Sequence, residues 1–295
     1  MGREARSVLV TGASAGIGRV LVHRLDRMGF RVFGTVRREE DGEALERETS
    51  SRTRAVLMDI TDSERVEAVR QELETEVGEH GLYGLVNNAG VIFGAPAEFQ
   101  PMAIVREQLE VNLVGHIGVT QAFLPLIRKA RGRIVYVGSG HRFAPAPFVA
   151  AYCASKSGLG AFADALRMEL APWGIEVIMV DPGATDTPMW DKSLPRIDKD
   201  FQALPEEARM LYHDLFYRTG RFFERLRQAG ASPDAVARII VRALTARRPR
   251  RLYLAGIDTR LAFLGDRLLP RSVHHRVLAT LAGIPRVRVG TSSST

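Results

Sequence analysis

Two ionisable side chains four residues apart, Tyr152 and Lys156, are well suited to move a proton. On a helix, positions i and i+4 lie on the same face, one turn apart. A free tyrosine has a pKa of about 10, and a fixed positive charge nearby favours the phenolate and lowers that pKa. The pair is therefore predicted to act in proton transfer, with Tyr152 as the general acid or base.

A glycine-rich turn near the N-terminus is predicted to hold a diphosphate. The apolar run 8–10 is typical of a buried parallel strand, and Gly12, Gly16 and Gly18 follow it. The apolar spacing from Ile17 onwards then predicts a helix. Free N–H groups at a helix N-terminus bind phosphate, and glycine lets the backbone approach closely. The spacing differs by one residue from the usual Gly-x-Gly-x-x-Gly of Rossmann folds.

Six motifs, in a fixed order over residues 5 to about 190, resemble those of the short-chain dehydrogenase/reductase family in its compact single-domain branch. They are TGASAGIG at 11–18, NNAG at 87–90, Asn112, Ser139, Tyr152-x3-Lys156 and Pro182-Gly-x3-Thr187. The stretch around Ser139 is similar to the steroid 17-dehydrogenase and retinol dehydrogenase group. Gly138 stands where many relatives have a first serine.

The resemblance implies a catalytic role for four side chains. Tyr152 would donate a proton to a carbonyl oxygen while hydride reaches the carbon, and Ser139 would hydrogen-bond that oxygen. Lys156 would lower the pKa of Tyr152 and hold the nicotinamide ribose. Asn112, a polar residue in an apolar helical stretch, would bind a water that connects Lys156 to solvent. His141, two residues after Ser139, could line the substrate pocket, but a place in a surface loop is at least as consistent with the sequence. It is therefore left out of the predicted site.

Cofactor choice depends on the end of the second predicted strand. NAD-specific relatives carry Asp where this chain has Val36, and Arg37 and Arg38 follow. A guanidinium matches a phosphate through two N–H groups, so these arginines, with the hydroxyl of Ser14, predict NADP(H) rather than NAD. Ala15, by contrast, stands where many NADP-dependent relatives have a further basic residue.

Other cofactor contacts are also implied by the resemblance. Asp59 would accept a hydrogen bond from the adenine amino group, with Ile60 against the ring, and the turn at 87–90 would support the adenosine. Thr187 would hydrogen-bond the nicotinamide carboxamide. The complete predicted set is Gly12, Ser14, Gly16, Ile17, Gly18, Arg37, Arg38, Asp59, Ile60, Asn87, Ala89, Gly90, Tyr152, Lys156, Pro182, Gly183 and Thr187. No metal site is predicted.

Strand-like and helix-like segments alternate along the chain. This alternation predicts the α/β class, as a single-domain Rossmann-like doubly wound parallel sheet with helices on both faces. One long helix is expected over about 101–129 and another over 152–170. The predicted strands are 8–10, 31–36, 55–58, 84–87, 133–137, 176–180 and 251–255.

The alternation loosens over about 188–230, which is rich in aromatic residues and methionine. This stretch is too apolar for a solvated loop and too long for an ordinary connection. Because it follows the strand on the nicotinamide side, we expect it to be a substrate lid. The alternative is a helical pair that only covers the core.

Length and composition indicate one domain in a reducing compartment. The 295 residues, 45% of them hydrophobic, suffice for one sizeable core, and we expect a single domain over 1–288 and a disordered tail over 289–295. The only cysteine, Cys153, excludes an internal disulfide. No apolar run approaches the ~20 residues that span a bilayer, so a cytoplasmic protein is expected, at most peripheral to a membrane.

The C-terminal part of the chain is strongly basic. Residues 238–288 contain twelve arginines and two aspartates, a net charge of +10 in a chain of net charge +7. The arginines alternate with apolar blocks, so the extension over about 246–288 is expected to pack on the enzyme or on a second subunit of a homodimer or homotetramer. The alternative is contact with an anionic membrane surface. The interspersed leucines argue against a nucleic-acid partner.

The predicted function is NADP(H)-dependent interconversion of a lipophilic ketone or aldehyde and its alcohol. The epimerase/dehydratase branch of the superfamily usually shows Gly-x2-Gly-x2-Gly and a larger C-terminal domain, which this chain does not match. A catalytically silent NADP-binding sensor or membrane-associated scaffold is the alternative from another class. Such members commonly lose the Tyr or the Lys, whereas Tyr152 and Lys156 are both present.

Overall fold

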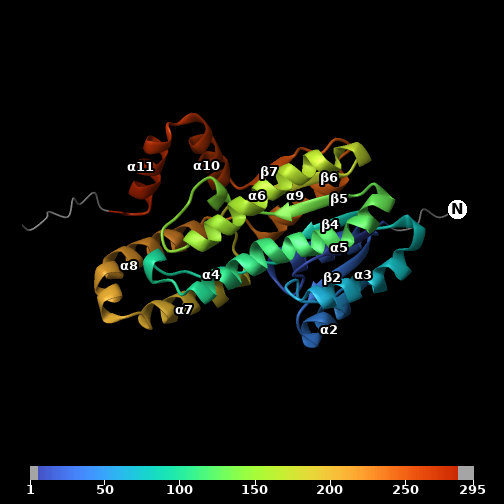
Figure 1. Ribbon diagram of the computed structural model, residues 1–295, viewed down its shortest axis with the longest axis horizontal. Coiled ribbons are helices and arrows are strands. Elements are labelled where there is room, and N and C mark those ends of the chain that lie inside the picture. Colours follow the sequence, from blue (N-terminus) through green and yellow to red (C-terminus); the bar gives the residue numbers. More distant parts are fainter. Residues whose placement is uncertain (1–5, 285–295) are drawn as a thin grey trace, which may run out of the picture.

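Seven parallel strands form one continuous sheet at the centre of the molecule (Figure 1). A computed structural model describes residues 6–284, with the strand order β3-β2-β1-β4-β5-β6-β7. The order reverses between β1 and β4, which confirms the doubly wound fold, and ligands of such sheets bind outside the carboxyl ends of the strands. The strands are β1 (Ser7–Val10), β2 (Arg31–Val36), β3 (Thr53–Leu57), β4 (Gly84–Asn87), β5 (Arg133–Val137), β6 (Glu176–Pro182) and β7 (Leu252–Ala255).

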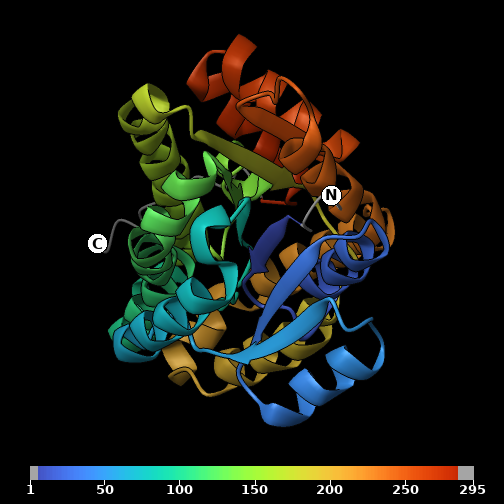
Figure 2. The ribbon, with the colours of Figure 1, turned by 90° about the vertical axis from the view of Figure 1, so that its right-hand side faces the viewer.

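Helices cover both faces of the sheet (Figure 2). Central strands such as β1 and β4 are buried over their whole length, so they need apolar cover on each side. One core contains side chains of α3, α5 and α6, and the other contains side chains of α1, α2 and α9. These helices are α1 (Gly16–Arg27), α2 (Glu39–Arg47), α3 (Ser63–Val77), α5 (Gly115–Ala130), α6 (Ala150–Leu170) and α9 (Pro233–Thr245).

The helix predicted over 101–129 is interrupted. It consists of α4 (Met102–Leu109), one π-helical turn at Glu110–Val114 and α5. Asn112 lies in the π turn, and its side chain exchanges two hydrogen bonds, each 2.9 Å, with the backbone N–H and C=O of Val91. A π turn inserts an extra residue into a helix and is frequent at functional sites. Here it turns a polar side chain toward the loop after β4.

The remaining helices extend past the carboxyl-terminal edge of the sheet (Figure 1). Residues 188–230 form α7 (Pro188–Gln202) and α8 (Glu206–Gln228), and the chain after β7 forms α10 (Ile257–Leu268) and α11 (Arg271–Leu281). Within residues 6–284, no helix has the length and hydropathy needed to cross a membrane. The tail expected to be disordered, 289–295, lies outside the described residues, as does the expected domain end at residue 288.

Candidate active site

A pocket of about 1340 Å³ opens at the carboxyl ends of the strands. Its lining comes from the loops after β1 to β6 and from the helices that extend past the sheet, so one cavity joins segments from the whole chain. Predicted site residues that line it are Gly12, Ser14, Gly16, Ile17, Arg37, Arg38, Asp59, Ile60, Ala89, Gly90, Ser139, Tyr152, Lys156, Pro182, Gly183 and Thr187. Gly18, Asn87 and Asn112 are the predicted site residues that do not line it.

The glycine turn after β1 has the backbone that a diphosphate site requires. Gly12 and Gly16 have positive φ angles of 69° and 57°, a region that favours glycine. A Cβ on Gly18 would overlap the carbonyl oxygen of Gly12 and lie 2.6 Å from Nδ2 of Asn88. Gly18 therefore allows close packing of α1 against the turn, and it does not line the pocket. Because α1 begins at Gly16, which lines the pocket, the free N–H groups of its first turn are available to a nucleotide diphosphate.

The end of the pocket that was predicted to hold the adenosine lies at the ends of β2 and β3. Arg37 and Arg38 are exposed there, and Arg38 is paired with Asp41 at 2.9 Å. Oδ1 of Asp59 accepts hydrogen bonds from the backbone N–H and hydroxyl of Thr61, at 2.9 and 2.8 Å. Asp62 caps α3 by accepting from the backbone N–H of Arg65, so Asp59 is not needed as a cap.

Asn87 was predicted to contact the cofactor, but it does not line the pocket. Its side chain is fully buried, donates to Thr120 at 3.0 Å and lies 3.3 Å from Nδ1 of His116. The other ring nitrogen of His116 lies 2.8 Å from the carbonyl oxygen of Ala89. Asn87, His116 and Thr120 thus form a buried hydrogen-bonded group behind the loop after β4, and Asn87 supports that loop from within. The alternation of side chains along β4 determines this placement, and Asn87 is the last residue of the strand.

Asn88, which was not among the predicted site residues, is hydrogen-bonded to the glycine turn. Its Nδ2 donates to the carbonyl oxygens of Thr11 and Gly12 at 2.9 and 3.2 Å, and its backbone N–H donates to the hydroxyl of Thr11 at 2.9 Å. These bonds tie the loop after β4 to the loop after β1. The doublet of asparagines was the available signal, because consecutive residues at a strand end face opposite sides.

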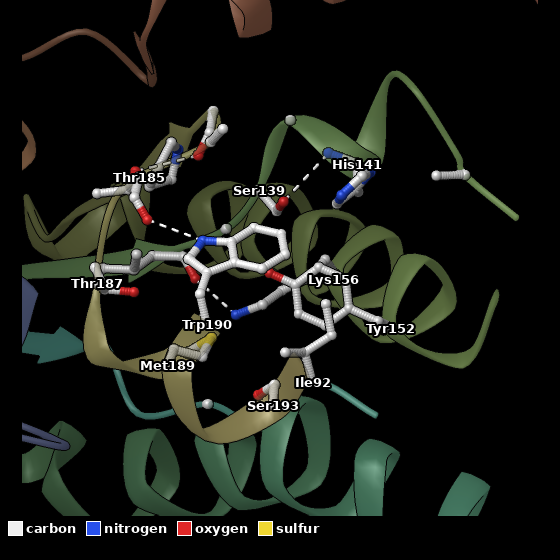
Figure 3. Close-up of a pocket in the computed structure, with 18 of the residues that line it drawn as sticks. Ile92, Ser139, His141, Tyr152, Lys156, Thr185, Thr187, Met189, Trp190 and Ser193 are labelled. Atoms are coloured by element: carbon white, nitrogen blue, oxygen red, sulfur yellow. Dashed lines mark hydrogen bonds between the residues drawn. The ribbon is translucent and has the colours of Figure 1, made fainter. Parts of the chain in front are cut away.

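Three of the four predicted catalytic side chains meet in the pocket (Figure 3). Tyr152 and Lys156 come from successive turns of α6, and Ser139 follows β5. Burial raises the pKa of Tyr152 to about 12, and a hydrogen bond with Ser139 opposes that rise. Burial also lowers the pKa of Lys156 to about 8.

The predicted lowering of the Tyr152 pKa by Lys156 is not found in this arrangement. Nζ of Lys156 donates to the carbonyl oxygen of Val137 at 3.0 Å and lies 5.9 Å from the centre of the Tyr152 ring. Desolvation of the phenol therefore has the larger effect. A phenol with a raised pKa is protonated at neutral pH, which suits Tyr152 to donate a proton.

Asn112 lies close behind these groups. It is fully buried, and besides the two bonds to Val91 its Nδ2 donates to the hydroxyl of Ser155 at 3.2 Å. A Cβ on Gly90 would lie 3.4 Å from Oδ1 of Asn112 and 3.7 Å from Nζ of Lys156. Both side-chain atoms thus face the space that Gly90 leaves open, and the water contact of Asn112 stays a prediction.

His141, which was left out of the predicted site, lines the pocket beside Tyr152 (Figure 3). The two rings are edge to face with centres 5.8 Å apart, and the ring of Phe223 from α8 is 5.9 Å from His141. Nδ1 of His141 lies 3.0 Å from the carbonyl oxygen of Ala144. Its place two residues after Ser139 was the only sequence signal.

One wall of the pocket is mostly apolar. Trp190, on the first turn of α7, projects into the pocket and donates from Nε1 to the carbonyl oxygen of Thr185 at 3.0 Å (Figure 3). Segment 188–230 and the C-terminal helices both contribute to this wall, and the role of 188–230 as a lid stays a prediction. Apolar lining residues from these helices are Met189, Trp190, Phe222, Phe223, Leu226, Leu261, Val277, Leu278 and Leu281.

A glycine turn at a helix N-terminus, beside a tyrosine, a serine and a lysine over one pocket, defines a nucleotide-dependent oxidoreductase site. The family model for short chain dehydrogenases matches residues 6–198. The chain is 38% identical to mouse retinol dehydrogenase 5 over 95% of its own length and 89% of that protein. It is 36% identical to rat 17-beta-hydroxysteroid dehydrogenase type 6 over 92% of its length and 87% of that protein.

Solved structures agree with this match. A short-chain dehydrogenase from Streptomyces avermitilis is similar with a TM-score of 0.75 and 27% identity, over 95% of this chain and 96% of that one. The chain therefore belongs to the short-chain dehydrogenase/reductase family, within the group of steroid and retinol dehydrogenases. Members of this family transfer hydride with a nicotinamide cofactor, so the protein is an oxidoreductase that uses NAD or NADP.

Proposed function

We propose that this protein interconverts a lipophilic ketone or aldehyde and its alcohol, with NADP(H) as the hydride carrier. The observation that supports this most is that Ser139, Tyr152 and Lys156 lie in one pocket with an apolar wall. When bound, the nicotinamide supplies or accepts the hydride. The residues of the glycine turn would hold its diphosphate, and Thr187 would hold its carboxamide.

The proton is the part of the reaction that this chain supplies. In the reductive direction, the protonated hydroxyl of Tyr152 donates to the carbonyl oxygen, and the hydroxyl of Ser139 stabilises the charge that develops there. Lys156, held on the next turn of the same helix, places a positive charge near the phenolate that remains. In the oxidative direction, Tyr152 must first lose its own proton, because its raised pKa of about 12 keeps it protonated at neutral pH. The phenolate then accepts the proton of the alcohol.

The size and apolar wall of the pocket support a lipophilic substrate. The two relatives named above are called a retinol dehydrogenase and a hydroxysteroid dehydrogenase, and both names refer to bulky apolar alcohols. Apolar surface removed from water contributes about 25 cal/mol per Å². A larger apolar substrate therefore gains more binding energy from residues such as Trp190, Phe223 and Leu226.

We expect kcat/KM to rise with apolar size along a series of ketones of the same carbonyl environment. One additional buried methylene contributes about 0.8 kcal/mol, so each should raise kcat/KM about fourfold until the pocket is filled. NADPH consumption, followed by its absorbance, measures the series. A flat series, or highest activity on a small charged carbonyl, would contradict the proposed substrate class.

We propose that the main role of the C-terminal helices is to pack on the enzyme beside the active site, and that membrane contact is secondary. Oδ2 of Asp258 on α10 accepts a hydrogen bond from the backbone N–H of Ala184, next to the Pro182-Gly183 turn, at 2.8 Å. Phe263 lies edge to face with Phe143, with ring centres 5.1 Å apart. These contacts anchor α10 beside the active site, and we propose that α10 and α11 enclose the substrate.

An exposed apolar stripe supports a second role for α10. Ile257, Leu261, Leu264 and Leu268 are 75%, 64%, 48% and 72% exposed, and their spacing places them on one helical face. Of these four, only Leu261 also lines the pocket. Exposed arginines flank the stripe at 260 and 267. We propose that a cytoplasmic homodimer or homotetramer uses this face for peripheral contact with anionic lipid.

Truncation after Gly256 removes α10 and α11 but keeps β7. Kinetics and lipid binding of the truncated chain therefore show which of the two roles these helices have. We expect the truncated chain to show at least about a tenfold higher KM for lipophilic ketones, since it loses part of the pocket wall. Flotation of both chains with anionic vesicles at low and high salt measures lipid contact, which weakens as charge is screened. Unchanged kinetics together with lost flotation would show that the segment serves the membrane alone.

A further inference from the structure

A buried ion pair lies directly behind Ser139. Asp181, on β6, is fully buried, and its Oδ1 accepts a hydrogen bond from the backbone N–H of Ser139 at 3.0 Å. Its Oδ2 accepts one from Arg142 at 2.6 Å. Burial raises the pKa of Asp181 to about 6, and Arg142 opposes that rise. Both carboxylate oxygens are thus bound to the short turn that carries Ser139.

Two glycines make room for this pair. A Cβ on Gly138 would overlap the carboxylate of Asp181 and lie 2.7 Å from Cε of Met179. A Cβ on Gly160, on α6, would overlap the guanidinium of Arg142. The ion pair therefore requires glycine at position 138, because a side chain there cannot coexist with the carboxylate.

We propose that Asp181, held by Arg142, is a positioning residue that directs the hydroxyl of Ser139 toward the reacting oxygen. Ser139 has extended backbone angles, φ −166° and ψ 151°, and its Oγ also accepts a hydrogen bond from the backbone N–H of His141 at 3.2 Å. Without the carboxylate, the buried N–H of Ser139 would lose its partner, and the turn would move to regain one. The inference rests on the proposed role of Ser139 in catalysis.

The test is Asp181→Ala in the wild-type chain and in Ser139→Ala. In the wild-type chain we expect kcat to fall by about tenfold or more, with less than about a threefold change in the Kd for NADPH. In Ser139→Ala we expect less than about a twofold further loss of kcat, because a positioning residue acts only through the side chain that it places. An equal factor of loss in both chains would overturn the proposal.

Gly138→Ala is the second variant, because it keeps both charged residues and displaces the carboxylate. We expect Gly138→Ala to lower kcat by about tenfold or more in the wild-type chain and by less than about twofold in Ser139→Ala. The control is Gly118→Ala, where an added Cβ meets nothing within 4 Å, and it should retain wild-type kcat. Wild-type kcat in Gly138→Ala would contradict the proposal, and so would a failure of both variants to fold, since the pair would then be purely structural. Activity that survives Tyr152→Phe would instead refute the proposed function, so the two failures are distinguishable.

Discussion

Replacing Tyr152 with phenylalanine is expected to abolish turnover while the fold and the affinity for NADPH stay intact. The substitution removes one oxygen atom and keeps the ring that packs against His141. General acid catalysis by a positioned side chain is typically worth 10²–10⁴-fold, so kcat should fall by at least about a hundredfold. Single-turnover reduction of a ketone and fluorescence titration with NADPH measure the two effects separately.

Tyr253→Phe is the matched control for this prediction. Tyr253 lies on β7, does not line the pocket, and its hydroxyl accepts one surface hydrogen bond from the backbone N–H of Arg250 at 3.1 Å. Its loss should leave kcat within about a factor of two. If Tyr152→Phe retains more than about one hundredth of the wild-type kcat, another group donates the proton.

Reversing the charge of Arg37 is expected to weaken NADPH binding by at least about tenfold and to leave NADH binding less affected. One charge-assisted hydrogen bond contributes about 1.5–3 kcal/mol, and the new carboxylate also repels the 2′-phosphate. Arg37 is exposed at the adenosine end of the pocket, whereas Arg38 already has Asp41 as its partner. Calorimetric titration of Arg37→Asp with both nucleotides measures the change.

Arg47→Asp provides the control for Arg37→Asp. Arg47 lies near the end of α2, is paired with Glu43 and does not line the pocket, so its reversal changes net charge equally without touching the nucleotide site. A similar loss of NADPH affinity in both variants would mean that only the general field of the protein acts. Equal affinity of the wild-type chain for NADPH and NADH would overturn the choice of NADP(H).

The sequence by itself determined the fold class and the family, and sixteen of the nineteen residues predicted for the site line the pocket. The strands β2, β4 and β5 begin and end where the apolar runs predicted, because a fully buried parallel strand reads as a short continuous apolar segment. The glycine turn and the pair Tyr152 and Lys156 could be found because their chemistry depends on local spacing along one turn or one helix. These features need no knowledge of distant contacts.

Only the tertiary structure decided which side of each element faces the pocket and what lies behind it. The exchange of roles between Asn87 and Asn88 follows from the facing of β4, and the raised pKa of Tyr152 follows from burial under helices that are remote in sequence. The carboxylate behind Ser139 comes from Asp181, 42 residues further along the chain, and has no local signature. Asp258 reaches Ala184 across 74 residues, so the C-terminal helices join the pocket through packing alone.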